Sequence, residues 1–197
     1  MAHPNLPPIV EVPAGAGLPG FHLGRTPVTN AEYAPFVASG RAPEPPWWLD
    51  PHYRDPQAPV VGVTWFEAAD FAAWLTELTG ERWRLPTESE WEHAACGGLV
   101  GAATAWGDAL PEGEIPQGPL AGPWRAGRGQ PNGYGLYDMG TIVHEWCCDW
   151  FDAAQSRRAS RGGSWRHHVR WSRPEARSSL PPDYRYSDYG FRVLREL

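Results

Sequence analysis

The chain has 197 residues, of which 42% are hydrophobic and 20% are charged. This composition predicts one globular domain over residues 1–197 with a sizeable core. Glycine and proline contribute 22 residues each, which excludes an all-helical bundle and a collagen-like repeat. No stretch approaches the roughly 18 apolar residues of a membrane span, and residues 1–8 lack the regions of a signal peptide. We therefore expect a cytoplasmic protein without a membrane span.

Charge is distributed unevenly along the chain. The net charge is −6, but residues 1–156 carry −12 and residues 157–197 carry +6. A basic segment can bind nucleic acid, yet the arginines of this one are interleaved with Trp, Tyr, His, Pro and Gly and form no dense run. We therefore expect the basic segment to fold against the acidic remainder of the chain, and nucleic acid is not the expected partner.

Three Thr-x-x-Glu sequences predict helix starts in the first half of the chain. In this pattern the threonine hydroxyl caps a free backbone N–H, and the glutamate reaches back to the cap. Apolar spacing and a following glycine extend each prediction to a full helix. The predicted helices and their caps are 30–39 after Thr29, 65–79 after Thr64 and 88–96 after Thr87.

Loops and short strands are predicted for the rest of the chain. Residues 42–59 and 97–131 contain many prolines and glycines, and Asn132-Gly133 is a strong tight-turn sequence. Aromatic residues spaced through the following segment favour short strands. The predicted fold class is therefore α+β, with two main helices beside small, twisted antiparallel sheets and many loops.

Seven short motifs occur in a specific order. They are residues 27–33 (PVTNAEY), 59–65 (PVVGVTW), 84–92 (RLPTESEWE), 131–139 (PNGYGLYDM), 145–146 (EW), 161–165 (RGGSW) and 190–192 (GFR). Together they resemble the formylglycine-generating enzyme (sulfatase-modifying factor) domain family over about residues 20–195. The resemblance implies a variant of the C-type lectin fold. A folding role for the aromatic residues predicts mostly buried positions for Trp65, Phe71, Trp91, Trp146, Trp165 and Phe191.

The resemblance also implies a copper(I) site formed by two cysteines between the GGS and GFR motifs, where soft sulfur ligands activate oxygen. No cysteine lies between Ser164 and Gly190. Cys147 and Cys148 lie in another stretch and would point in opposite directions in an extended chain, while Cys96 stands alone. We therefore expect no copper site, and the sequence favours a protein that is not an enzyme.

Other metal sites find little support in the sequence. In the family segment that commonly reads GNxWEW, Thr141, Ile142 and His144 replace the glycine, the asparagine and the first tryptophan, and isoleucine offers calcium no oxygen. His144 and Cys148 would share a face only in a helix, and zinc needs further ligands. Adjacent His167 and His168 are poorly placed to ligate one ion as a pair. We therefore expect neither calcium nor any other metal cofactor.

Residues 165–189 are predicted to form a binding surface, because Tyr, Trp, Arg, His and Ser dominate in binding sites where rigid aromatic rings act beside adaptable polar groups. The candidate contact residues are Arg166, His167, His168, Trp171, Ser178, Ser179, Leu180, Tyr184, Tyr186, Ser187 and Asp188. Largely exposed positions on one contiguous patch are expected for Arg166, His167, His168, Trp171, Tyr184, Tyr186 and Asp188.

The same segment resembles the variable region of proteins diversified by retroelements, which use this lectin-fold variant for display. In that group GGSW is followed by substituted positions, often templated as asparagine, and then by GFR. Adenine replacement in an AAC codon yields Arg, His, Tyr, Ser, Asp, Leu, Pro, Val or Ala, which covers most positions here but not Trp171. The leading hypothesis is a display protein for a macromolecular ligand such as a protein. An enzyme with an altered, oxidoreductase-type site and a structural interaction module remain alternatives.

Overall fold

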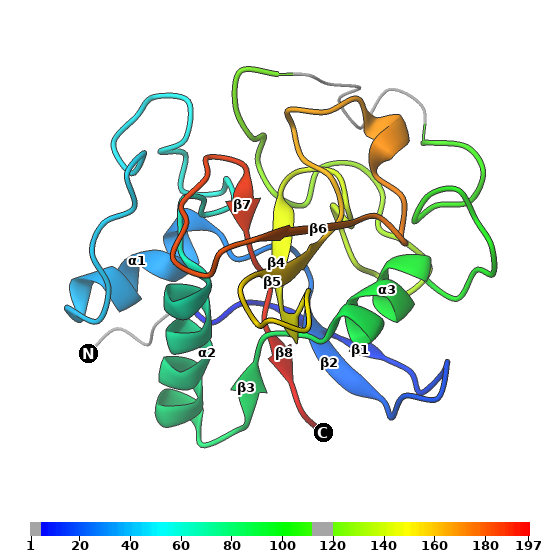
Figure 1. The fold of residues 1–197 in the computed structure, drawn as a ribbon, viewed down its shortest axis with the longest axis horizontal. Helices are drawn as coiled ribbons and strands as arrows, with labels where there is room; N and C mark the ends of the chain where they lie inside the picture. Colours follow the sequence, from blue (N-terminus) through cyan, green and yellow to red (C-terminus); the bar gives the residue numbers. More distant parts are fainter. Residues whose placement is uncertain (1–4, 112–119) are drawn as a thin grey trace.

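The fold consists of two small sheets with helices packed beside them (Figure 1). The computed structural model describes residues 5–111 and 120–197, apart from the side chain of Trp171. The helices are α1 (Asn30–Ala38), α2 (Trp65–Thr79), α3 (Glu88–Cys96) and the 3₁₀ helix η1 (Val169–Trp171). The strands are β1 (Ile9–Val12), β2 (Phe21–Gly24), β3 (Trp83–Arg84), β4 (His144–Trp150), β5 (Arg158–Arg161), β6 (Arg177–Leu180), β7 (Tyr189–Gly190) and β8 (Leu194–Arg195). The α+β class is confirmed.

The three α-helices begin at the predicted threonine caps. At α2 the Glu67 backbone N–H donates to the Thr64 hydroxyl at 3.2 Å, and the Thr64 N–H donates to the Glu67 carboxylate at 2.9 Å. Equivalent capping boxes start α1 and α3. Gly80 ends α2 at a φ of 75°, where glycine avoids the strain of a side chain. Among the described residues, no helix combines the length and the apolar character needed to cross a membrane.

The strands form two sheets, of which the first joins β1 and β2 from the start of the chain with β8 from its end. Their strand orders are β1-β2-β8-β3 and β6-β5-β4-β7, and every pairing is antiparallel except that of β4 with β7. The prediction of antiparallel sheets is therefore wrong at this parallel pair. The strands β6 and β7 lie on opposite edges of the second sheet, and residues 181–188 cross from one edge to the other, so β7 runs beside β4 in the same direction (Figure 1). His144 consequently lies opposite Tyr189.

The predicted aromatic core is buried with one exception. Phe71, Trp91, Trp146, Trp165 and Phe191 are each 5% exposed or less. Trp65 is half-buried and packs against the core, so it is the least buried of the six residues. Its indole N–H donates to the Cys147 carbonyl at 2.8 Å, and the Arg158 guanidinium lies 3.6 Å above its ring. An indole with a hydrogen-bond acceptor and a cation over its face tolerates partial exposure.

An ion pair between Glu145 and Arg192 is completely buried. Both side chains are 0% exposed, and their two N–O contacts measure 2.6 and 2.9 Å. The Trp91 indole N–H donates to the same carboxylate at 2.6 Å. Arg192 also donates to the carbonyls of Gly24 and Tyr137, at 2.8 and 3.1 Å. The pair therefore connects β4 with α3 and with the end of β2.

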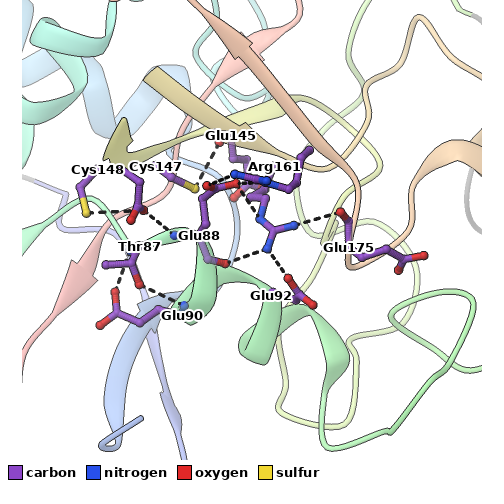
Figure 2. Close-up of polar contacts among 11 residues, drawn as sticks. Thr87, Glu88, Glu90, Glu92, Glu145, Cys147, Cys148, Arg161 and Glu175 are labelled. Atoms are coloured by element: carbon purple, nitrogen blue, oxygen red, sulfur yellow. Dashed lines mark hydrogen bonds and ion pairs between the residues drawn. The ribbon is translucent and has the colours of Figure 1, made fainter. Parts of the chain in front are cut away.

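The basic C-terminal segment folds against the acidic remainder of the chain, as expected (Figure 2). Arg161 on β5 is 3% exposed and forms ion pairs with Glu88 and Glu92 of α3. It also donates to the Glu175 carbonyl at 3.0 Å. Arg177 on β6 binds the Glu88 carboxylate through two contacts of 2.6 Å. These ion pairs neutralise, within the molecule, part of the opposite charges carried by residues 1–156 and 157–197.

Replacing Arg192 by methionine would leave the buried Glu145 carboxylate without its cation. Because an uncompensated buried charge is costly, Arg192→Met should lower the free energy of unfolding by about 3–5 kcal/mol. The matched control is Arg41→Met, which breaks the exposed Arg41–Glu77 pair and should cost less than about 1 kcal/mol. Urea denaturation measures both values, and equal losses would contradict a special role for the buried pair.

Candidate binding surface and histidine cluster

The predicted binding segment, residues 165–189, is flanked by buried residues at both of its ends. Trp165 is 5% exposed and Phe191 is 0% exposed. Just before Trp165, Gly162 has a φ of 77°, and a Cβ added there would lie 2.6 Å from the Cα of Gly140. Glycine is required for this close approach of two backbones. The motifs on either side of the segment therefore act as structural anchors.

The structure exposes five of the predicted contact residues, which we call the C-terminal surface. They are Arg166, His167, His168, Tyr184 and Tyr186. The two tyrosine side chains are 49% and 43% exposed. Ser178, Ser179 and Leu180 lie on β6 and are half-buried. The side chain of Trp171 lies outside the described residues.

The exposed residues belong to two turns that contact each other. The Arg166 guanidinium donates to the Ser187 hydroxyl at 2.8 Å, and the Trp165 indole donates to the Ser187 carbonyl at 3.4 Å. On the other side, the Tyr186 ring lies 6.2 Å from that of Tyr189. These contacts hold the turn after Trp165 against residues 184–188.

Two predicted contact residues lie inside the protein. Ser187 is 4% exposed and Asp188 is 5% exposed, so the prediction that Asp188 faces solvent is wrong. The Asp188 carboxylate accepts a hydrogen bond from the Ser164 hydroxyl at 2.8 Å. The Asp188 backbone carbonyl accepts a hydrogen bond from the backbone N–H of His144 at 2.9 Å. Such hydrogen bonds compensate a buried polar group, and Asp188 therefore supports the surface from beneath.

Two histidines and an aspartate meet under the C-terminal surface. His144, His167 and Asp188 each direct one possible ligand atom into a group whose members lie within 4.8 Å of one another. His144 is 9% exposed, whereas His167 faces solvent. Burial lowers the pKa of His144, and the Asp188 carboxylate partly opposes this effect. The neutral imidazole of His144 is thereby favoured.

The structure separates the histidines from the partners that adjacency in the sequence suggests. His144 and Cys148 both lie in the strand β4, where four residues span about 13 Å. His167 is followed by His168, whose ring accepts a hydrogen bond from the Arg170 backbone N–H at 3.2 Å. The group containing Asp188 was missed because it depends on the parallel pairing of β4 with β7.

The cysteines do not fit the copper site that the family resemblance implies. Cys147 is buried and Cys148 is half-buried on β4. Burial raises the pKa of both thiols, that of Cys148 to about 11. The thiolate is the form that binds a metal, so both residues are poor ligands at neutral pH.

Side chains of residues 138–146, the segment that resembles the family calcium site, already make contacts within the protein. The two carboxylate oxygens of Asp138 accept hydrogen bonds from the Trp124 indole at 3.2 Å and from the Gly127 N–H at 2.6 Å. Burial raises the pKa of Asp138 to about 6. Ile142 is 0% exposed and packs in the core. These residues pair with protein donors or pack against apolar neighbours.

Comparison with known proteins identifies the family. A model described as "Sulfatase-modifying factor enzyme 1-like domain" matches residues 11–197. The chain belongs to this family. Formylglycine-generating enzyme of Streptomyces coelicolor is 32% identical over 89% of this chain and 78% of its own length. The Bos taurus protein named inactive C-alpha-formylglycine-generating enzyme 2 is 34% identical over 74% of this chain and 58% of its own.

Solved structures confirm the lectin-type fold of this sulfatase-modifying factor domain. PvdO of Pseudomonas aeruginosa has a TM-score of 0.78 at 23% identity, covering 96% of this chain and 90% of PvdO. Treponema denticola variable protein 1 has a TM-score of 0.78 at 21% identity, covering 98% and 92%. The Major Tropism Determinant I1 variant has a TM-score of 0.54 at 15% identity, covering 89% and 50%. The resemblance to variable proteins is thus confirmed at the level of the fold.

Burial predicts different tolerance to substitution at the surface and at its anchors. His168→Ala and Tyr184→Ala, at exposed sites, should each change the free energy of unfolding by no more than about 0.5 kcal/mol. Trp165→Ala removes a buried ring and should cost roughly 3–5 kcal/mol. Denaturant titrations of the three variants provide the measurement. A large loss at His168 or Tyr184 would show that these side chains are packing groups.

Proposed function

We propose that this family member binds a macromolecular ligand, such as a protein, through its C-terminal surface. The observation that carries the proposal is the exposure of Tyr184 and Tyr186 beside Arg166, on turns fixed by buried Trp165 and Phe191. Aromatic rings held on a rigid scaffold bury large areas at a small entropic cost, and arginine adds directional hydrogen bonds. Ser178, Ser179 and Leu180 are further candidate contacts at half-buried positions.

The proposed function includes diversification of this surface by a retroelement. Treponema denticola variable protein 1 shares the fold over nearly the whole chain, which supports the proposal. The residue types on the surface, Arg, His and Tyr, all arise from an AAC codon by adenine replacement. The buried anchors at residues 162–165 and 190–192 would remain constant while the exposed positions change.

An enzyme with altered chemistry is the second candidate, because relatives named formylglycine-generating enzyme are 32% identical to this chain. A small-molecule substrate would favour a concave pocket beside the histidines. One cavity of about 590 Å³ instead lies against α3 and is lined by His93, Cys96 and Tyr134. A structural interaction module is a third candidate and would use the same exposed surface.

Sequencing the 3′ end of the gene in many cells of one culture tests diversification. We expect substitutions concentrated at the codons of His168, Tyr184 and Tyr186, with Trp165 and Phe191 unchanged, because only exposed positions tolerate many side chains. A reverse transcriptase gene and a near-copy of the 3′ end should lie nearby. Evenly spread substitutions with no near-copy in the genome would refute the retroelement proposal.

A peptide assay tests the enzyme alternative. Incubation of the protein with copper(I), oxygen and a cysteine-containing sulfatase peptide should leave the cysteine unmodified, because no cysteine lies between Ser164 and Gly190 to bind copper. Mass spectrometry of the peptide gives the readout, with the Streptomyces coelicolor enzyme as positive control. Aldehyde formation above a no-protein control would favour the enzyme.

A further inference from the structure

The group formed by His144, His167 and Asp188 has the donor set of a transition-metal site. Two imidazole nitrogens and one carboxylate oxygen suit zinc and iron(II), and three protein ligands leave coordination positions open. The donors come from β4, from the turn after Trp165 and from the residue before β7. No thiol is among them, which separates this group from the copper-binding cysteines of the family resemblance.

Hydrogen bonds already orient the two buried donors. The Nδ1 of His144 lies 2.8 Å from the Gly162 carbonyl oxygen. Because a carbonyl only accepts, Nδ1 donates the hydrogen and Nε2 retains its lone pair. The Ser164 hydroxyl donates to Oδ2 of Asp188, which leaves the other carboxylate oxygen available. Partners of this kind around a histidine and a carboxylate are typical of metal ligands.

The backbone joins the three ligand segments to one another. The His144 N–H donates to the Asp188 carbonyl at 2.9 Å, and the His167 N–H donates to the Ser164 carbonyl at 2.9 Å. Ser164 therefore contacts two of the three donor residues, one through its backbone and one through its hydroxyl. An arrangement held at this many points restricts where each donor atom can lie.

We infer that His144, His167 and Asp188 bind one divalent transition-metal ion. An ion at about 2.1 Å from each donor holds the donors about 3–3.5 Å apart. The present separations extend to 4.8 Å, so binding requires one side chain to move by roughly an ångström. His167 is exposed and is free to make that rotamer change, whereas the other two donors are buried.

Such an ion would lie at the base of the C-terminal surface. Two of its ligands are buried and the third, His167, is exposed to solvent. His167 and Asp188 then act as metal ligands, while Arg166, His168, Tyr184 and Tyr186 remain available for contact. This inference does not depend on diversification of the surface.

Titration of the full chain with Co²⁺ after removal of bound metals tests the inference. We expect one cobalt ion per chain, displaced by Zn²⁺, with no sulfur-to-cobalt charge-transfer band because the donors are nitrogen and oxygen. Binding should also raise the melting temperature, since a ligand of the native state stabilises it. Failure to bind one equivalent, or a sulfur band indicating the cysteines, would overturn the inference.

Variants locate the site. His167→Ala removes an exposed donor and should weaken cobalt binding more than tenfold. Ser164→Ala removes the hydroxyl that orients the Asp188 carboxylate and should weaken binding roughly 10–100-fold. The matched control is His168→Ala, an adjacent exposed histidine outside the cluster, which should leave affinity unchanged. Equal losses in His167→Ala and His168→Ala would overturn the assignment. Circular dichroism of each variant without metal excludes unfolding as the cause.

Discussion

The completely buried ion pair between Glu145 and Arg192 is the constraint on which the rest of the structure depends. Two charges that are shielded from solvent are tolerated only when both are hydrogen-bonded. Here the Trp91 indole donates to the carboxylate, and the guanidinium donates to two backbone carbonyls. Glu145 lies in β4 opposite Gly190 of β7, two residues before Arg192. The pair therefore fixes the parallel register of these strands and closes the C-terminal segment at its far end.

The helices could be predicted because the information for each is local. A threonine, a glutamate three residues later and a terminal glycine suffice, and α2 and α3 have the predicted bounds. The histidine cluster could not be predicted in this way. His144 and Asp188 are far apart in sequence and meet only because β4 and β7 pair in parallel. Neither the composition nor a local motif predicts that strand pairing.

Composition also fails to separate contact residues from supporting residues within the segment. Tyr186 is 43% exposed, while Ser187 and Asp188 immediately after it are 4% and 5% exposed. All three belong to the residue types common in binding sites, so the sequence treats them alike. Hydrogen bonds decide their roles, since Asp188 pairs with Ser164 and Ser187 pairs with Arg166. Trp65 shows the converse, because a cation over its ring permits exposure of a residue expected in the core.

Burial separates the positions of this protein that tolerate substitution from those that do not. Trp165 and Phe191 pack in the interior on either side of the segment, so the fold does not require sulfur, or any particular chemistry, at the exposed positions between them. His144 and Asp188 differ, because their hydrogen bonds to Gly162 and Ser164 attach them to the anchor motif itself. The two buried donors of the proposed metal site are therefore fixed by the anchor motif, whereas the third donor, His167, belongs to the exposed positions that the fold constrains less.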